Sequence, residues 1–151
     1  MNTNSAEILR EKGISPSVQR VAIYDYLMTH FTHPTVDEIF KDLSPSIPTL
    51  SKTTIYNTLT LFLEHGLIDS FTTDDNTAHY DGNVQSHAHF QCSQCGEIYD
   101  IPMPKTEAPQ LEGFEINGMK VFYYGICEKC RKKEIQIFND LKFKDLTRTN
   151  N

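Results

Sequence analysis

Four cysteines in two C-x-x-C pairs are the residues with the clearest chemistry in this chain: Cys92 with Cys95, and Cys127 with Cys130. Two such pairs are typical of tetrahedral thiolate coordination of zinc. We predict a structural zinc ion held by all four thiolates, with no cysteine left for reactions. Paired redox disulfides are the alternative, but neither pair lies at the strand-to-helix turn of a thioredoxin-like motif.

His87 and His89 stand two residues apart, immediately before the first cysteine pair. On a β-strand this spacing directs both rings to one face, while Ala88, Phe90 and Cys92 point to the other. That face could hold a second metal ion. The simpler alternative is a pair of exposed strand histidines.

Length and composition describe a globular chain of one large or two small domains, with 151 residues, 38% apolar and 11% aromatic. It contains no apolar run long enough to span a bilayer, and its N-terminus does not resemble a secretory signal. We therefore expect a cytoplasmic protein without a membrane partner. In that reducing compartment, paired cysteines favour metal over disulfides.

The net charge of −6 argues against non-specific attraction to nucleic acid. The residues through 83 carry five basic and eleven acidic side chains, so any DNA contact would depend on local placement.

The N-terminal half predicts helices separated by turns. Residues 4–12 form the first helix, and Ser15 caps a second that opens with Pro16 and runs to about residue 28. Thr35 and Glu38 predict a capping box for a third helix, which ends near residue 43.

A fourth predicted helix begins after Ser51 and ends at Gly66. Its apolar face comprises Ile55, Leu59, Phe62 and Leu63. The opposite face carries uncharged residues: Thr53, Tyr56, Asn57 and Thr60. A hairpin of residues 67–71 and 78–81 follows, so the pattern predicts a winged helix-turn-helix with the fourth helix in a major groove. A plain helical bundle is the alternative.

The C-terminal half predicts a small sheet, with strands at 87–92, 97–101 and 119–124. Residues 102–112 contain three prolines and can hold only a short helix. The tail is expected to be helical from Glu128 to about Leu146 and to fray from Thr147 to Asn151.

An ordered series of motifs resembles the ferric uptake regulator (Fur) family of metal-dependent bacterial repressors. It comprises Gln19-Arg20, His33-Pro34-Thr35, Thr54-Ile55-Tyr56, Gly66-Leu67-Ile68, His87-Ala88-His89, the first cysteine pair with Gly96, and Gly125-Ile126-Cys127. The resemblance implies an α+β fold: a winged helix-turn-helix DNA-binding domain (1–82), a linker (83–86) and a small α/β dimerisation domain with the four-cysteine zinc site (87–151). It also implies a homodimer bound to a double-stranded DNA operator.

Asp81, Asp100 and Asn57 resemble the peroxide-sensing branch of the family. The branch implies a regulatory site that binds Fe(II) or Mn(II), metals that suit nitrogen and oxygen ligands. The implied ligands are His33, Asp81, His87, His89 and Asp100. His33 and His87 would be oxidised by peroxide. An iron-uptake or zinc-uptake regulator that senses only metal is the alternative.

For DNA, we expect Arg20 and Lys52 to contact phosphates, Asn57 to contact adenine, and Tyr56 with the threonine methyl groups of Thr53 and Thr60 to contact thymine. Contacts to adenine and thymine from both subunits of a homodimer predict an operator that is an A·T-rich palindrome.

The chain departs from the family at Ala88 and at Gly118 or Met119, so no additional metal site is expected there. The span between Asp100 and Phe114 is also short for the family's usual helix. His30, His65 and His79 are expected to be surface or packing residues. A non-haem iron oxygenase is a competing class, because two histidines and a carboxylate can also bind catalytic iron, but the chain lacks a substrate-pocket motif. A zinc-stapled protein-interaction module is another, but it would leave the capped fourth helix and the wing without a role.

Overall fold

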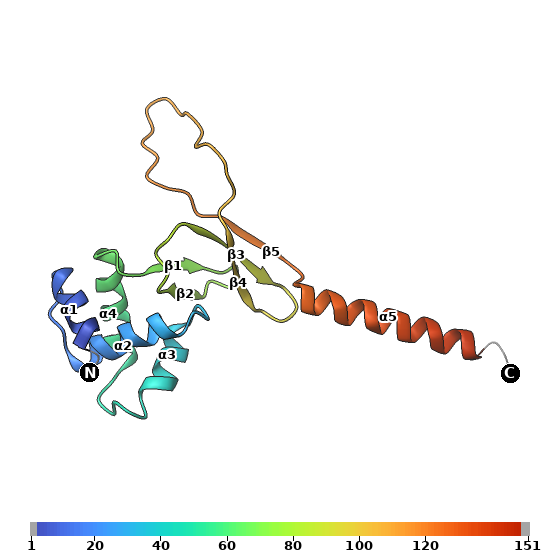
Figure 1. Cartoon of the computed structure of the whole chain (residues 1–151), viewed down its shortest axis with the longest axis horizontal. Coiled ribbons are helices and arrows are strands. Elements are labelled where there is room, and N and C mark those ends of the chain that lie inside the picture. Colours follow the sequence, from blue (N-terminus) through green and yellow to red (C-terminus); the bar gives the residue numbers. More distant parts are fainter. Residues whose placement is uncertain (1–2, 149–151) are drawn as a thin grey trace. The chain divides into compact units, whose positions relative to one another are not determined.

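The computed structural model describes residues 3–148 and divides into two compact units, Met1–Gln85 and Ser86–Asn151. The first contains four helices and a two-stranded wing, and the second contains a three-stranded sheet and one long helix (Figure 1). This is the predicted α+β class. No helix among residues 3–148 is both long and apolar enough to cross a membrane.

The helices of the first unit are α1 (Thr3–Glu11), α2 (Val18–Thr29), α3 (Val36–Leu43) and α4 (Lys52–Glu64). The predicted capping box of α3 is present, because Thr35 accepts from the Glu38 amide and the Glu38 carboxylate accepts from the Thr35 amide. Ser51 caps α4 as predicted. The predicted start of α2 is wrong: Ser17, not Ser15, accepts from the Arg20 amide, so the helix begins after Pro16.

The core of this unit comes from one face of each helix. Side chains with 0% exposure include Leu9, Ile23, Leu27, Ile39, Ile55, Leu59 and Phe62. Of the predicted apolar face of α4, Ile55, Leu59 and Phe62 are fully buried and Leu63 is half-buried. Burial of this face fixes the rotation of α4 and turns its polar face to solvent.

The wing is an antiparallel hairpin of β1 (Asp69–Thr72) and β2 (Ala78–Asp81). Asn76 adopts φ 64° in the turn, and the Thr73 hydroxyl donates to Asp75 in the same turn. Asparagine tolerates this left-handed conformation, which explains why the turn lies between the two predicted strands of the hairpin.

The sheet of the second unit has strand order β4-β3-β5. Its central strand β3 (His87–Cys92) pairs antiparallel with β4 (Ile98–Pro102) and parallel with β5 (Phe122–Gly125). The predicted bounds of β3 are confirmed. The third strand was predicted to begin at Met119, but β5 begins three residues later, at Phe122. Only the last part of the predicted segment pairs with β3.

Residues 103–121 form neither helix nor strand, so the short helix allowed within 102–112 is absent. Pro104 and Pro109 remove backbone donors from this segment, which disfavours a helix there. The chain then reaches α5 (Glu128–Arg148), which continues two residues past the predicted end at Leu146. Of the predicted frayed end, 147–148 are helical and 149–151 lie outside the described residues.

Candidate metal centres and the polar face of α4

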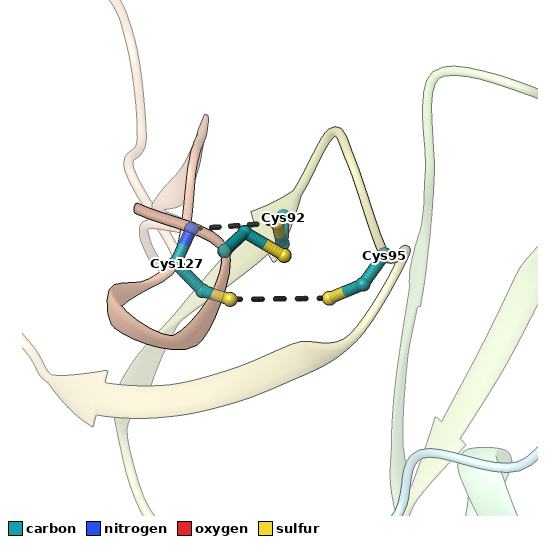
Figure 2. Close-up of side chains that lie close together, drawn as sticks. Cys92, Cys95 and Cys127 are labelled. Atoms are coloured by element: carbon teal, nitrogen blue, oxygen red, sulfur yellow. Dashed lines mark hydrogen bonds between the residues drawn. The ribbon is translucent and has the colours of Figure 1, made fainter. Parts of the chain in front are cut away.

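The four cysteines come together, with their sulfur atoms all within 4.8 Å of one another. The Sγ atoms of Cys95 and Cys127 lie 3.9 Å apart and point toward one another (Figure 2). Thiolates at the corners of a tetrahedron around zinc, with bonds of about 2.3 Å, would lie about 3.8 Å apart. The spacing therefore fits zinc and is far longer than the disulfide bond of about 2.05 Å.

Backbone amides make the site favourable for thiolates. The amide of Cys127 donates to Sγ of Cys92 across 3.3 Å, as Figure 2 shows. Amides of Cys95 and then Cys127 lower the pKa of Cys92 to about 6. The amide of Cys130 is the main cause of a lowered pKa at Cys127, whereas burial raises the pKa of Cys130. A bound cation would deprotonate the remaining thiols outright.

The cysteine cluster connects two parts of the second unit. Cys92 ends β3 and Cys95 lies in the turn toward β4, while Cys127 and Cys130 flank the start of α5. A backbone bond from Ser93 N–H to the Gly125 carbonyl (2.7 Å) joins the same two regions. A zinc ion here would staple the sheet to the helix.

His87, His89 and Asp100 form a second cluster on the same sheet. The two Nε2 atoms are 3.0 Å apart, and each lies 3.4 to 3.5 Å from Oδ1 of Asp100. Strand register explains this, because His89 pairs with Asp100 and His87 lies two residues away on the same face. Ligands on an ion with bonds of about 2.1 Å would be separated by about 3.0 to 3.4 Å. The three atoms therefore fit one face of a metal coordination sphere.

His33 and Asp81 form a pair within the first unit. Both are buried, with 3% exposure, and Nε2 of His33 lies 3.5 Å from Oδ2 of Asp81. The other carboxylate oxygen of Asp81 accepts from the Asn83 amide at 2.8 Å. A buried imidazole and carboxylate at this distance also suit a shared metal ion.

His79 is a residue whose role the sequence prediction missed. Its Nδ1 donates to the carbonyl of His33 across 2.7 Å, and its ring stacks on Phe71 with centroids 5.4 Å apart. His33 has φ 56°, a strained conformation for a residue other than glycine. Position 79 lies two residues before Asp81 on β2, and this shared face is the sequence signal that could have identified it.

The outward face of α4 is uncharged and accessible. Its four exposed side chains are those predicted for DNA contact: Thr53, Tyr56, Asn57 and Thr60. Beside them, a hollow of about 420 Å³ has Ser17, Gln19, Arg20, Thr54 and Asn57 among its lining residues.

The two predicted phosphate ligands have protein partners in this structure. The Arg20 guanidinium donates to the Ser15 carbonyl at 2.8 Å. Nζ of Lys52 lies 2.8 Å from the Asp37 carboxylate. Lys52 is exposed and Arg20 is half-buried. Exchange of an exposed ion pair such as that of Lys52 for a phosphate contact would cost little.

A winged-helix unit combined with a sheet unit that carries thiolate and histidine–carboxylate clusters defines a class, the metal-dependent transcriptional regulators. The chain belongs to the ferric uptake regulator family, whose model matches residues 11–126. It is therefore a transcriptional repressor of this family and not an enzyme, which removes the oxygenase alternative.

Individual relatives refine this assignment. Over 130 residues the chain is 38% identical to the peroxide-responsive repressor PerR of Staphylococcus aureus (strain Mu50 / ATCC 700699), covering 83% of this chain and 88% of that protein. The structure of PerR from Streptococcus pyogenes is similar with TM-score 0.50 and 29% identity, covering 84% and 90% of the two chains. The iron-containing ferric uptake regulator of Francisella tularensis gives TM-score 0.66 and 25% identity, covering 79% and 96%.

Proposed function

We propose that this protein is a cytoplasmic, homodimeric repressor of A·T-rich palindromic operators that senses hydrogen peroxide through a metal-loaded histidine site. The similarity to PerR of S. aureus supports the peroxide signal, since that relative is peroxide-responsive and covers most of the chain. The donor atoms of the two histidine–carboxylate groups support the metal site.

The proposed regulatory site joins both groups: His33 and Asp81 from the first unit with His87, His89 and Asp100 from the second. Three imidazole nitrogens and two carboxylate oxygens suit Fe(II) or Mn(II) better than a soft-ligand metal. The four-cysteine cluster would hold the structural zinc. The two sites would therefore select different metals, because one offers soft thiolates and the other offers harder nitrogen and oxygen ligands.

Ligands from two units would make the interdomain angle depend on metal. In a homodimer this angle sets the separation of the two α4 helices, which must match half-sites about one helical turn apart. A shift from about 1% to 99% of the binding-competent form needs about 5.5 kcal/mol of differential affinity. Five ligands shared between two units would supply that free energy.

Bound Fe(II) would supply the one-electron chemistry that cleaves the O–O bond of peroxide. In the net reaction, one peroxide oxygen is added to an imidazole carbon and the other leaves as water. His33 and His87 are the proposed targets. An oxidised ring is a poorer ligand, so the five side chains would no longer hold the metal. The interdomain angle would then no longer be fixed, and the protein would dissociate from the operator. The cysteines, held by zinc, would stay unreacted.

On DNA, the exposed face of α4 supports readout without arginine: Asn57 can pair with adenine, and Tyr56 and the methyl groups of Thr53 and Thr60 can contact thymine methyls. Arg20 and Lys52 would contact phosphates.

One experiment tests the proposal. The protein is loaded anaerobically with Fe(II) or Mn(II), treated with low peroxide and mapped by peptide mass spectrometry, with operator binding measured in parallel. We expect oxygen on His33 and His87 and operator release with Fe(II), and neither with Mn(II). Oxygen confined to cysteines, or equal with both metals, would reject peroxide sensing. Metal-dependent binding without a peroxide response would leave the metal-only regulator.

A further inference from the structure

The chain that leaves the wing strand β2 is ordered by its own side chains. The Asn83 amide donates to Oδ1 of Asp81 at 2.8 Å, and the Gln85 amide donates to Oδ1 of Asn83 at 3.0 Å. The backbone bends at Gly82 and again at Gln85. Asp and Asn side chains that accept from an amide two residues later form Asx turns, which fix the local backbone path. This stretch, residues 81–85, is the Asx segment.

Gly82 packs directly on the last turns of α2. A Cβ atom at this position would lie 2.7 Å from the carbonyl oxygen of Leu27, 3.2 Å from its carbonyl carbon and 3.0 Å from Cε of Met28. Even a close C–H···O contact keeps carbon and oxygen about 3.3 Å apart. The Leu27 side chain is fully buried in a close-packed core, so its backbone cannot move aside at low cost. Glycine is therefore required for the chain to leave β2 along this path.

The two oxygens of the Asp81 carboxylate face different partners. Oδ2 lies 3.5 Å from Nε2 of His33, on the side where the proposed metal would bind. Oδ1 accepts from the Asn83 amide and so holds the Asx segment. A carboxylate has lone pairs on both oxygens, so the amide bond can persist when a metal binds. The orientation of this one buried group is therefore set by the backbone that follows it.

The Asx segment also lies between two of the proposed metal ligands. Under the proposed function, Asp81 and His87 bind the same ion, although His87 follows six positions later. Ligands of one ion lie about 3.0 to 3.4 Å apart, whereas six extended residues span about 20 Å. The chain between the two ligands must therefore fold back. The Asx segment supplies bends in that stretch, so its path limits the positions that His87 can take.

We propose that the Asx segment is the positioning element of the regulatory site. Gly82 sets its path against α2, and the Asn83 amide holds the Asp81 carboxylate toward His33 before metal binds. The inference rests on the metal site of the proposed function and adds two positioning residues, Gly82 and Asn83, that are not themselves ligands. Metal binding at Asp81 is thereby coupled to the path of the chain toward the second unit.

The first test separates the two oxygens of Asp81 in the full-length protein, with zinc in the cysteine site and no other metal added. Asp81→Asn has nearly the same shape and keeps an oxygen for the Asn83 amide, but it loses the carboxylate for the metal. Asp81→Ala loses both. Hydrogen–deuterium exchange of the peptide covering 81–85 is measured by mass spectrometry, and unchanged exchange in α4 verifies folding.

We expect near wild-type protection of the Asx segment in Asp81→Asn. Exchange should be about three- to tenfold faster in Asp81→Ala, because one hydrogen bond is lost. Both variants should bind Mn(II) more weakly than the wild type. Equal exchange of residues 81–85 in the two variants would overturn the proposal that Asp81 organises this segment.

The second test is Gly82→Ala. The added methyl group does not fit against Leu27, so the Asx segment should shift and its protection should fall. Mn(II) affinity should fall about 10-fold to 100-fold, the usual cost of losing a group that positions a ligand. Zinc content should not change. Wild-type Mn(II) affinity in Gly82→Ala would overturn the positioning role.

Two control variants distinguish positioning from a general loss of stability. Gly118→Ala adds a methyl group where no atom lies within 4 Å, and it should bind Mn(II) like the wild type. Leu9→Ala destabilises the first unit through its core, because Leu9 is fully buried in α1. At a temperature where it is folded by circular dichroism, Leu9→Ala should keep its Mn(II) affinity. An equal loss of affinity in Leu9→Ala and Gly82→Ala would contradict the proposal.

The outcomes separate this inference from the proposed function. A wild-type protein that binds no metal besides zinc would contradict the regulatory site, whereas the exchange measurements without added metal would still decide whether Asp81 organises the Asx segment. Tight Mn(II) binding by a variant whose residues 81–85 exchange freely would overturn the positioning role alone.

Discussion

The imidazole of His79 donates a hydrogen bond to the backbone carbonyl of His33 across 2.7 Å, although the two residues are 46 positions apart. The bond connects the wing strand β2 to the loop before α3. A neighbouring bond from the Tyr80 amide to the Pro34 carbonyl (3.0 Å) reinforces it. These contacts hold His33 at its positive φ and keep its ring beside Asp81.

His79→Ala should therefore weaken metal binding at the proposed regulatory site without affecting zinc binding at the four cysteines. Loss of a residue that positions a ligand typically costs about 10-fold to 100-fold in metal affinity. The measurement is Mn(II) titration of the zinc-loaded protein. His79→Asn, which keeps an amide donor, should recover part of the affinity. His65→Ala is the control, because His65 makes a similar bond at 2.8 Å, but to Leu61 of its own helix. Equal Mn(II) affinity in His79→Ala and His65→Ala would contradict the positioning role.

Cys95→Ser should remove zinc and destabilise the second unit, because thiolate coordination contributes directly to the folding free energy of small sites. We expect loss of near-stoichiometric zinc and of the dimer, while the helical first unit keeps its fold. Zinc content by mass spectrometry and sedimentation test this. Ser93→Ala in the same turn is the control and should keep its zinc. A Cys95→Ser protein that is still dimeric and still binds one zinc per chain would show that the four-cysteine zinc site does not stabilise the second unit.

Tyr56→Ala should reduce specific operator affinity by about 1 to 3 kcal/mol, the usual range for one base-edge contact. Its side chain is 52% exposed on α4, so the fold should not change. Fluorescence anisotropy on operator and scrambled DNA would measure the loss. Uracil in place of thymine removes the methyl group and should reproduce part of the effect in the wild type. An unchanged ratio of specific to non-specific binding would exclude Tyr56 from readout.

Tyr26 predicts alkaline sensitivity of the first unit. Burial and, next, its 2.6 Å hydrogen bond to Asp42 raise the pKa of Tyr26 well above its ordinary value of 10. The folded state thus favours the protonated phenol. Its contribution to stability is complete below pH 10 and is lost progressively as pH rises above 10 toward the folded pKa.

Tyr26→Phe should therefore flatten the decline in the free energy of unfolding above pH 10, measured by urea unfolding followed by circular dichroism. At neutral pH the variant should lose about 1 to 3 kcal/mol, because Asp42 loses a partner. Asp42→Asn leaves Tyr26 buried but removes the carboxylate that accepts its hydrogen bond. The free energy of unfolding of this variant should decline above pH 10 with a slope between those of the wild type and Tyr26→Phe. A wild-type slope in Tyr26→Phe would assign the alkaline transition to other groups.

Much of this architecture could be predicted because the signals are local. Thr35 with Glu38 fixes the start of α3 through bonds spanning three residues, and alternation along 87–92 sets β3 without reference to its neighbours. The cysteine cluster was predictable because its ligand spacing is itself a short-range signature.

The errors lie where a choice depends on tertiary contacts. Ser15 and Ser17 are both suitable caps, and the Arg20 guanidinium bond to the Ser15 carbonyl accompanies the choice of Ser17. The start of β5 depends on parallel pairing with β3, which periodicity cannot reveal. His79 was missed because its partner is a backbone carbonyl distant in sequence, and a main-chain acceptor leaves no trace in residue type.

The six residues of β3 place histidine donors on one face and Cys92 at the end of the other. This shared strand links the two clusters. Closing the sulfur cluster would tie β5 and the start of α5 to β3, the strand that holds His87 and His89 opposite Asp100. Under the proposed function, a newly made chain would therefore need zinc before its regulatory histidines could bind a second metal, which would make the cell's zinc supply a condition for sensing.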